Sequence, residues 1–265
     1  MELFGYIASA FIGLSLGLIG GGGSILTVPV LVYLFGISPL LATSYSLFIV
    51  GSTSLIGAVN NLRKGEVSLK AAFLFGTTSI ITVFATRRFL IPEIPRELWT
   101  ISGTTITEPF VTMVLFGVLM LLASFSMIRN KNDDAARMAG CTEYGKFFKL
   151  LGYGISIGLV TGLLGAGGGF LLIPALVLFI GLPMKKAVGT SLLIIALNSL
   201  FGFLADLGHF QIDWGFLLLI ALIATAGVLI GGRVARVIPS AKLKTGFGWF
   251  ILVMGIYIIL KEFLG

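Results

Sequence analysis

The sequence predicts an all-α polytopic membrane protein built from two inverted repeats of about five helical segments each. An apolar composition, a long internal repeat and an uneven distribution of basic residues predict it. Of 265 residues, 57% are hydrophobic and 11% charged, and no charged side chain occurs from Leu3 to Leu62. A soluble domain carries about 25% charged residues, and a helical span needs about 20 apolar residues. Composition therefore predicts several membrane spans.

The chain repeats itself with an offset of 145 residues. GLSLGLIGGGGSILTVPVLVYLFG (13–36) aligns without a gap with GLVTGLLGAGGGFLLIPALVLFIG (158–181), and 20 of the 57 pairs from 13/158 to 69/214 are identical. The glycine run, a proline and two serines coincide in the two copies. We therefore expect two transmembrane repeats, 1–128 and 149–265, that form one transport domain and are joined by a basic linker at 129–148.

Each repeat contains five apolar segments. They cover about 3–19, 24–38, 39–62, 70–87 and 109–128 in the first repeat, and about 149–164, 169–184, 187–205, 213–232 and 245–260 in the second. The first two segments of each repeat flank the glycine run and hold roughly 13–17 residues each. At 1.5 Å per residue they are short for a core of about 30 Å. They form either one broken span or a helical hairpin, which is re-entrant or fully spanning.

Basic residues favour the hairpin, because cytoplasmic loops are enriched in lysine and arginine. A broken span divides the basic residues nine to nine between the two sides, whereas a hairpin with external termini places fourteen inside and only Arg87, Arg88, Arg96 and Lys261 outside. The hairpin makes the repeats inverted and the linker cytoplasmic. The external segment 87–108 has no counterpart of similar length in the second repeat, and we expect a short amphipathic surface piece there.

The glycine runs Gly20–Ser24 and Gly165–Gly169 are expected to form the two hairpin tips. Sites of secondary transporters with inverted repeats lie near the bilayer midplane, at broken helices. Two opposed helix N-termini there would hold an anion through backbone N–H groups, with Ser24 as a helix cap and without a buried lysine or arginine. Gly13 and Gly17 instead fit close helix packing.

Hydroxyl and amide groups follow each hairpin and could complete a shell around an oxyanion, although serine and threonine also satisfy helix backbone. The predicted substrate-binding residues are Gly20, Gly21, Gly22, Gly23, Ser24, Ser44, Ser46, Gly165, Ala166, Gly167, Gly168, Gly169, Thr190, Ser191 and Asn198.

Other chemistries find little support in the sequence. Asp206 and His209 form a possible proton-coupling pair, although a solvated loop histidine is the simpler interpretation. The single cysteine, Cys141, cannot form an internal disulfide or a metal cluster. No metal ligand set and no nucleophile with a base is visible, so we expect no enzyme, cofactor or metal. The net charge of +7 is assigned to cytoplasmic loops rather than to nucleic-acid binding.

The twin glycine-rich segments, followed by TSYSLF (43–48) and GTSLLI (189–194), resemble the TauE/SafE sulfite exporter family, also called TSUP. The resemblance covers nearly the whole chain. It implies a multi-pass protein of the inner membrane that moves a sulfur-containing anion such as sulfite, thiosulfate, sulfoacetate or another organosulfonate. Two pairs of tip residues differ between the copies: Gly21 against Ala166, and Ser24 against Gly169.

The sequence thus favours a secondary transporter that works by alternating access, with a bilayer, a small anion and a possible coupling ion (H⁺ or Na⁺) as partners. A passive anion channel is the alternative within transport. A membrane scaffold or assembly factor that binds a partner through the basic linker is the alternative from another class.

The inverted topology predicts that residues 64 and 208, which occupy corresponding loops, face opposite sides of the membrane. With Cys141 replaced by serine, single cysteines are placed at Lys64 and Gly208 and treated with a membrane-impermeant maleimide in intact cells. We expect label at 208 only, because 64 lies in the cytoplasmic loop. Labelling of both positions from one side would exclude inverted repeats.

Overall fold

The computed structural model describes residues 2–19, 21–93, 97–101, 104–129, 143–165, 167–209, 211–234 and 240–264. The described chain is almost entirely helical. Its elements are α1 (Glu2–Ile19), η1 (Gly21–Leu26), α2 (Thr27–Tyr33), α3 (Pro39–Arg63), α4 (Leu69–Ala85), η2 (Thr86–Leu90), η3 (Ile91–Glu93), β1 (Glu97–Ile101), β2 (Thr104–Thr107), α5 (Glu108–Arg129), α6 (Glu143–Leu164), α7 (Gly169–Ile180), α8 (Met184–Asp206), α9 (Trp214–Val234) and α10 (Ser240–Leu264).

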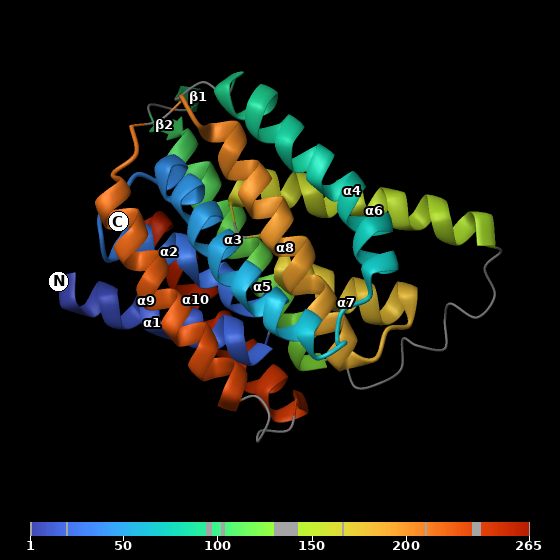
Figure 1. Cartoon of the computed structure of the whole chain (residues 1–265). Helices are drawn as coiled ribbons and strands as arrows, with labels where there is room; N and C mark the ends of the chain where they lie inside the picture. Colours follow the sequence, from blue (N-terminus) through green and yellow to red (C-terminus); the bar gives the residue numbers. More distant parts are fainter. Residues whose placement is uncertain are drawn as a thin grey trace.

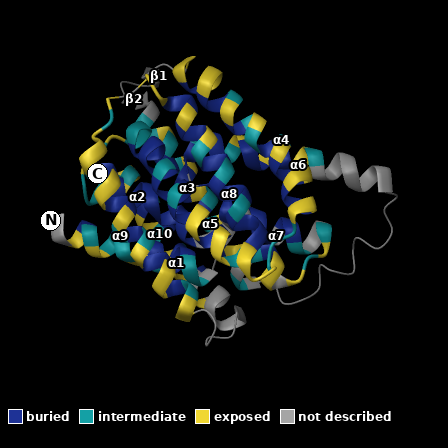
Figure 2. Cartoon of the chain, viewed as in Figure 1, coloured by how far each residue is buried: buried dark blue, intermediate teal, exposed yellow. Residues whose placement is uncertain are grey.

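Four helical segments in the described chain are long and apolar enough to cross a membrane: Pro39–Arg63, Leu69–Glu93, Lys185–Asp206 and Trp214–Val234. Four shorter apolar helices accompany them. Large exposed side chains such as Phe73 and Leu222 are apolar, and Figure 2 shows the exposed residues along the outward faces of the helices, around a buried interior. An apolar outer surface over a packed interior is what a bilayer requires of a polytopic protein.

Helices α3 and α8 lie side by side at the centre of the molecule (Figure 1). Early residues of one meet late residues of the other: Phe48 packs against Phe203, and Gly57 lies against Leu192. The two helices therefore run in opposite directions. Because α3 and α8 occupy equivalent positions in the two sequence copies, their antiparallel packing is the arrangement that inverted repeats require.

The surrounding helices exchange partners between the halves. Helix α1 packs on α9, and the equivalent helix α6 packs on α4; α5 packs on its own equivalent, α10. In Figure 1 the α1–α9 pair and the α4–α6 pair flank the central helices on opposite sides. A pseudo-twofold axis between α3 and α8 relates these pairs of helices. Because the pairs contain helices from both halves, the halves form one body.

Two hydrogen bonds repeat under the same relation. The backbone N–H of Ser68, which caps α4, donates to Thr190 Oγ1 at 2.9 Å. The backbone N–H of Asp213, whose carboxylate accepts from Phe216 N at the start of α9, donates to Tyr45 OH at 2.8 Å. Each of these bonds fixes the start of an outer helix to the central helix of the other repeat.

Glycines bring the outer helices into close contact. The Cα of Gly13 faces the backbone carbonyl of Ala224, and at the equivalent contact a Cβ on Gly158 would lie 2.7 Å from Ser79 O. Helix interfaces in membranes use small residues in this way, so that backbones approach closely. The expectation that Gly13 serves packing is confirmed.

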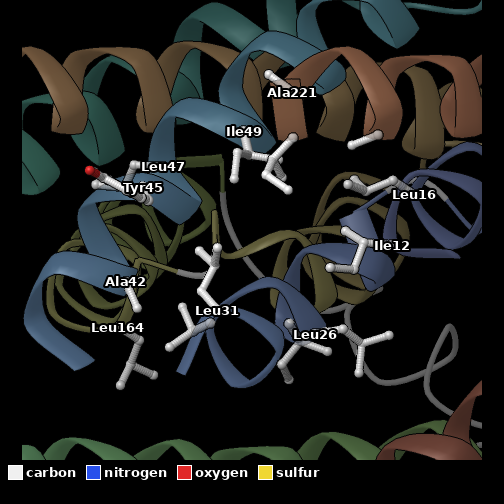
Figure 3. Close-up of a cluster of buried hydrophobic side chains, with 14 of the residues drawn as sticks. Ile12, Leu16, Leu26, Leu31, Ala42, Tyr45, Leu47, Ile49, Leu164 and Ala221 are labelled. Atoms are coloured by element: carbon white, nitrogen blue, oxygen red, sulfur yellow. The ribbon is translucent and has the colours of Figure 1, made fainter. Parts of the chain in front are cut away.

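The main apolar core joins the first hairpin to the central helix. Figure 3 shows Leu31 of α2 among buried side chains that include Ile12 of α1, Ala42 of α3 and Leu164 of α6. Residues from both repeats thus share one core, which holds η1 and α2 inside the protein.

Segment 87–108 differs from the expected amphipathic surface piece. Its first residues continue α4 as a π-helical turn, and the strands β1 and β2 pair with each other in antiparallel orientation. Threonine and isoleucine in TTIT favour strand over helix, because side chains branched at Cβ lose rotamer freedom in a helix. In the second half, α6 begins at Glu143, inside the expected linker. The rest of the linker, with Cys141, lies in residues 130–142, outside the described chain, so the predicted division into repeats stays a prediction.

Replacement of Gly13 by alanine is expected to destabilise the fold, because the new Cβ meets the Ala224 carbonyl. Overpacking of this kind costs about 1–3 kcal/mol. Gly152→Ala is the matched control, since no heavy atom lies within 4 Å of a Cβ at that position on α6, and helix propensity gives it a small gain. The midpoint of thermal unfolding in detergent should fall for the first variant only; equal midpoints would contradict the close α1–α9 contact.

Candidate functional site

The second glycine run forms a sharp turn inside the protein. Gly165, Gly167 and Gly168 have φ of 66°, 65° and 64°, the left-handed region that glycine enters without strain. Helix α7 starts at Gly169, and its N-cap residue is Gly168, which has no side chain to cap the helix. The first N–H groups of a helix have no partner within the helix, so the start of α7 brings backbone donors to this turn, which we call the second tip (residues 165–169). Ala166 lies outside the described residues.

The second tip packs on the middle of the central helices. A Cβ on Gly167 would lie 2.8 Å from Val50 Cγ1, 2.9 Å from Ile195 Cγ2 and 3.2 Å from Ser199 Oγ. Val50 and Ile195 lie near the midpoints of α3 and α8, so the tip lies at the interface of the two repeats. Ser46 Oγ donates to Gly165 O at 2.7 Å and anchors the tip to α3.

Hydroxyl groups surround this turn. Ser199 and Thr161 are fully buried, and neither Ser199 Oγ nor Thr161 Oγ1 has a hydrogen-bond partner among the described residues. The Cα of Gly168 faces Thr161 Oγ1. A buried donor without a partner costs about 1–3 kcal/mol, so these hydroxyls favour a polar ligand. Together with the N–H groups of α7, they offer hydrogen bonds and a partial positive charge to an anion.

The first glycine run has a different structure. Residues 21–26 form a 3-10 helix that continues directly into α2, which has seven residues. The predicted anion contacts at this run stay a prediction. The expectation that Ser24 caps this helix is wrong, because α2 begins at Thr27 with Leu26 at its N-cap and no side-chain cap bond. The 3-10 turn delays the helix by three residues. Gly20 lies outside the described residues.

The structure nevertheless brings the first run near the second hairpin, since η1, which contains Gly21, Gly22, Gly23 and Ser24, contacts α7. Gly23 is buried against α1, where a Cβ would lie 2.9 Å from Ile12 O. The first run therefore lies beside the helix that follows the second tip. Among the described tip residues, positive φ occurs at Gly165, Gly167 and Gly168.

The predicted polar residues have separate positions. Thr190 accepts a bond from the start of α4, and Ser191 Oγ donates to Val188 O of its own helix at 2.8 Å. Asn198 Nδ2 donates to Ser79 Oγ at 2.7 Å, while its Oδ1 has no partner among the described residues. Ser44 is buried next to the Asp206 carboxylate. Thr190 and Ser191 thus form hydrogen bonds with helix backbone, whereas Asn198 Oδ1 can still accept a hydrogen bond.

A buried cation is present, contrary to the expectation from the sequence. Arg87, expected in an external loop, is fully buried in η2, and its Nη1 donates to Asp206 Oδ2 and to Thr43 Oγ1 at 3.1 Å each. The π-helical turn extends α4 past its apolar segment and places the side chain against α8. The Asp206 carboxylate, which is 1% exposed, neutralises it there.

His209 is exposed and bonds Asp206 through backbone atoms, His209 N to Asp206 O at 3.0 Å. The Asp206 side chain pairs with Arg87 instead. Proton coupling through Asp206 and His209 stays a prediction.

The polar residues of α4 and α8 form two facing rows. Ser79 pairs with Asn198, and Arg87 pairs with Asp206; the partners in each pair are 119 residues apart. Between these two pairs, a Cβ on Gly202 would lie 2.8 Å from Val83 Cγ1. The constant separation shows that α4 and α8 run in the same direction. Apolar packing at Gly202 therefore separates the ion pair from the amide pair.

The equivalent rows on α9 and α3 are much less polar. At an offset of 145 residues, Ser79, Arg87, Asn198 and Asp206 correspond to Ala224, Gly232, Thr53 and Asn61. Polar chemistry is therefore concentrated on the α4–α8 interface beside the second tip. The second copy has Asp206 where the first has Asn61, and this difference was visible in the sequence. Its partner Arg87 lies beyond residues 13–69, the part of the first copy that was aligned with the second.

A protein-family model for the sulfite exporter TauE/SafE matches residues 6–258. Among similar curated proteins, a probable membrane transporter protein of Xylella fastidiosa (strain 9a5c) is 27% identical over 258 residues, which cover 96% of this chain and 94% of the relative. The probable membrane transporter protein YunE of Bacillus subtilis is 27% identical, over 92% of this chain and 89% of the relative. No solved structure matches.

The second tip depends on left-handed backbone and on the absence of a Cβ. Gly167→Ala should cost more stability than Gly181→Ala. Both sites have positive φ, 65° and 72°, and so share the backbone strain, but only Gly167 is enclosed by protein; nothing lies within 4 Å of a Cβ on Gly181. Thermal unfolding of the two purified variants measures the difference. Equal losses would show that the second tip is not tightly packed.

Proposed function

Because the chain belongs to the TauE/SafE sulfite exporter family of membrane transporters, we propose that it is a secondary transporter of a small sulfur-containing oxyanion, with its binding site at the second tip. Sulfite, thiosulfate, sulfoacetate and other organosulfonates share several negatively charged oxygen atoms around one sulfur. Such anions suit convergent N–H and O–H donors.

One observation carries this proposal: the start of α7 lies at the middle of α3 and α8, beside fully buried hydroxyls without a protein partner among the described residues. Non-helical backbone at membrane depth is tolerated where it is buried in protein or lines a cavity. Backbone donors at the centre of a repeat interface are the feature that secondary transporters use to hold an anionic group.

The arrangement of the helices supports alternating access. The antiparallel pair α3 and α8 forms the contact between two halves that exchange their outer helices. Rocking of one half about this contact would open the tip to one side of the membrane and then to the other. An anion moved outward gains about 2.3 kcal/mol per charge per 100 mV from an inside-negative potential, so export needs no further energy source.

We place the protein in the inner membrane, with both termini outside and the basic segment 129–148 in the cytoplasm. This orientation puts most lysine and arginine residues on the cytoplasmic side. It follows from the charge distribution and is tested by the cysteine labelling described above.

The proposal predicts that Ser199→Ala weakens anion transport without loss of stability, since Ser199 Oγ has no partner to lose among the described residues. A hydrogen bond to a charged group contributes about 1.5–3 kcal/mol, so the KM for the transported anion should rise about tenfold or more. Counterflow of radiolabelled sulfite, thiosulfate or sulfoacetate in proteoliposomes measures it.

Ser52→Ala is the matched control, because Ser52 Oγ donates to Phe48 O of its own helix at 2.8 Å; its KM should stay within about twofold. Absence of counterflow with every sulfur anion would reject the proposed transporter. Flux that neither saturates nor shows counterflow would identify a passive channel instead.

A further inference from the structure

Arg87 uses only one of its three guanidinium nitrogens in the described structure. Nη1 serves both Asp206 and Thr43, whereas Nε and Nη2 are buried and have no hydrogen-bond partner among the described residues. The side chain is fully buried. Unsatisfied donors of a buried charged group are among the most costly groups in a protein, so a structural ion pair alone does not account for this geometry.

The two remaining nitrogens have a specific shape. Nε and Nη2 lie on one edge of the planar guanidinium, and their N–H groups can bind two oxygens of a single centre in parallel. A sulfonate, sulfite or sulfate group presents two such oxygens on one sulfur. A halide presents a single atom, so it cannot accept from both N–H groups in two parallel, linear hydrogen bonds.

The position of Arg87 links it to the second tip. Thr43 Oγ1 accepts from Arg87, and the backbone of Thr43 lies directly against Gly165. Ser46, one turn further along α3, holds the carbonyl of Gly165. A single side chain thus separates the guanidinium from the glycine turn.

Asp206 affects how strongly the Arg87 guanidinium attracts an anion. Its Oδ2 pairs with Nη1, while its Oδ1 has no partner among the described residues. The paired carboxylate keeps the site neutral before an anion arrives and repels the anion once it is bound. A transported ion must be released as well as bound. Repulsion by the Asp206 carboxylate weakens anion binding, while the N–H groups of Arg87 still orient the anion.

We propose that the Nε–Nη2 edge of Arg87 binds two oxygens of the transported sulfur oxyanion, next to the second tip, while Asp206 holds the opposite side of the guanidinium. This assignment rests on the proposed transport function and names its cationic contact. It also assigns selectivity: the site distinguishes anions with two oxygens on one centre from single-atom anions.

Binding to the purified full chain in detergent tests the assignment. The rise in unfolding midpoint is titrated with sulfoacetate, with sulfate and, at equal ionic strength, with chloride. We expect sulfoacetate or sulfate, but not chloride, to stabilise the wild-type protein. Arg87→Lys keeps the charge and the partner Asp206 but loses the planar fork, so its affinity should fall about tenfold or more and its preference over chloride should disappear.

Asp206→Asn should act in the opposite direction, because it removes the competing charge: its affinity for the oxyanion should rise. A pair with only a structural role would lower the midpoint of both variants and leave the anion response of each unchanged. Arg88→Lys, a change at the exposed neighbouring residue, is the matched control and should bind within about twofold of wild type.

Should Arg87→Lys fail to fold, the double variant Arg87→Gln with Asp206→Asn replaces the ion pair by two amides that can bond each other. This variant should fold and show no selective oxyanion response. Wild-type affinity in either folded Arg87 variant would overturn the assignment while the transport function stands. No oxyanion response in the wild type would reject the proposed function and the assignment together.

Discussion

The close antiparallel contact between α3 and α8 is the interaction on which the rest of the structure depends. Both helices are buried along much of their length, and equivalent helices of the two repeats meet there. The outer pairs α1–α9 and α4–α6 are then placed by exchange between the repeats. Because the glycine turn at 165–169 is enclosed by this central pair, its non-helical backbone is shielded from lipid, where unsatisfied N–H groups would be prohibitively costly.

The two halves are alike in packing and unlike in chemistry. Gly13 against Ala224 repeats Gly158 against Ser79, and the hydrogen bonds that fix the starts of α4 and α9 repeat as well. The ion pair does not repeat, since glycine stands at the position equivalent to Arg87. Buried charges carry a large desolvation cost, and among the described residues the buried ion pair lies where η2 meets α8. The two copies thus share their packing and differ in the charged residues of this interface.

The glycines serve two physical purposes that composition alone does not separate. Gly13 and Gly158 are helical and permit close approach of backbones, whereas Gly167 and Gly168 have positive φ and reverse the chain. A methyl group would disrupt the first kind by collision and the second by both collision and backbone strain. Similar sequence runs therefore form a 3-10 turn in one repeat and a left-handed turn in the other.

The sequence by itself determined the membrane character, the duplication and the position of the second tip, because apolar length and a repeated glycine pattern act locally. It also identified Gly13 as a packing residue. Only the tertiary structure decided that Arg87 is buried, that Arg87 rather than His209 pairs with the Asp206 side chain, and that Leu26 rather than Ser24 stands at the N-cap of α2. These outcomes depend on which helices face each other across 119 residues of chain, and a pairing between faces of separate helices is not encoded in the periodicity of either one.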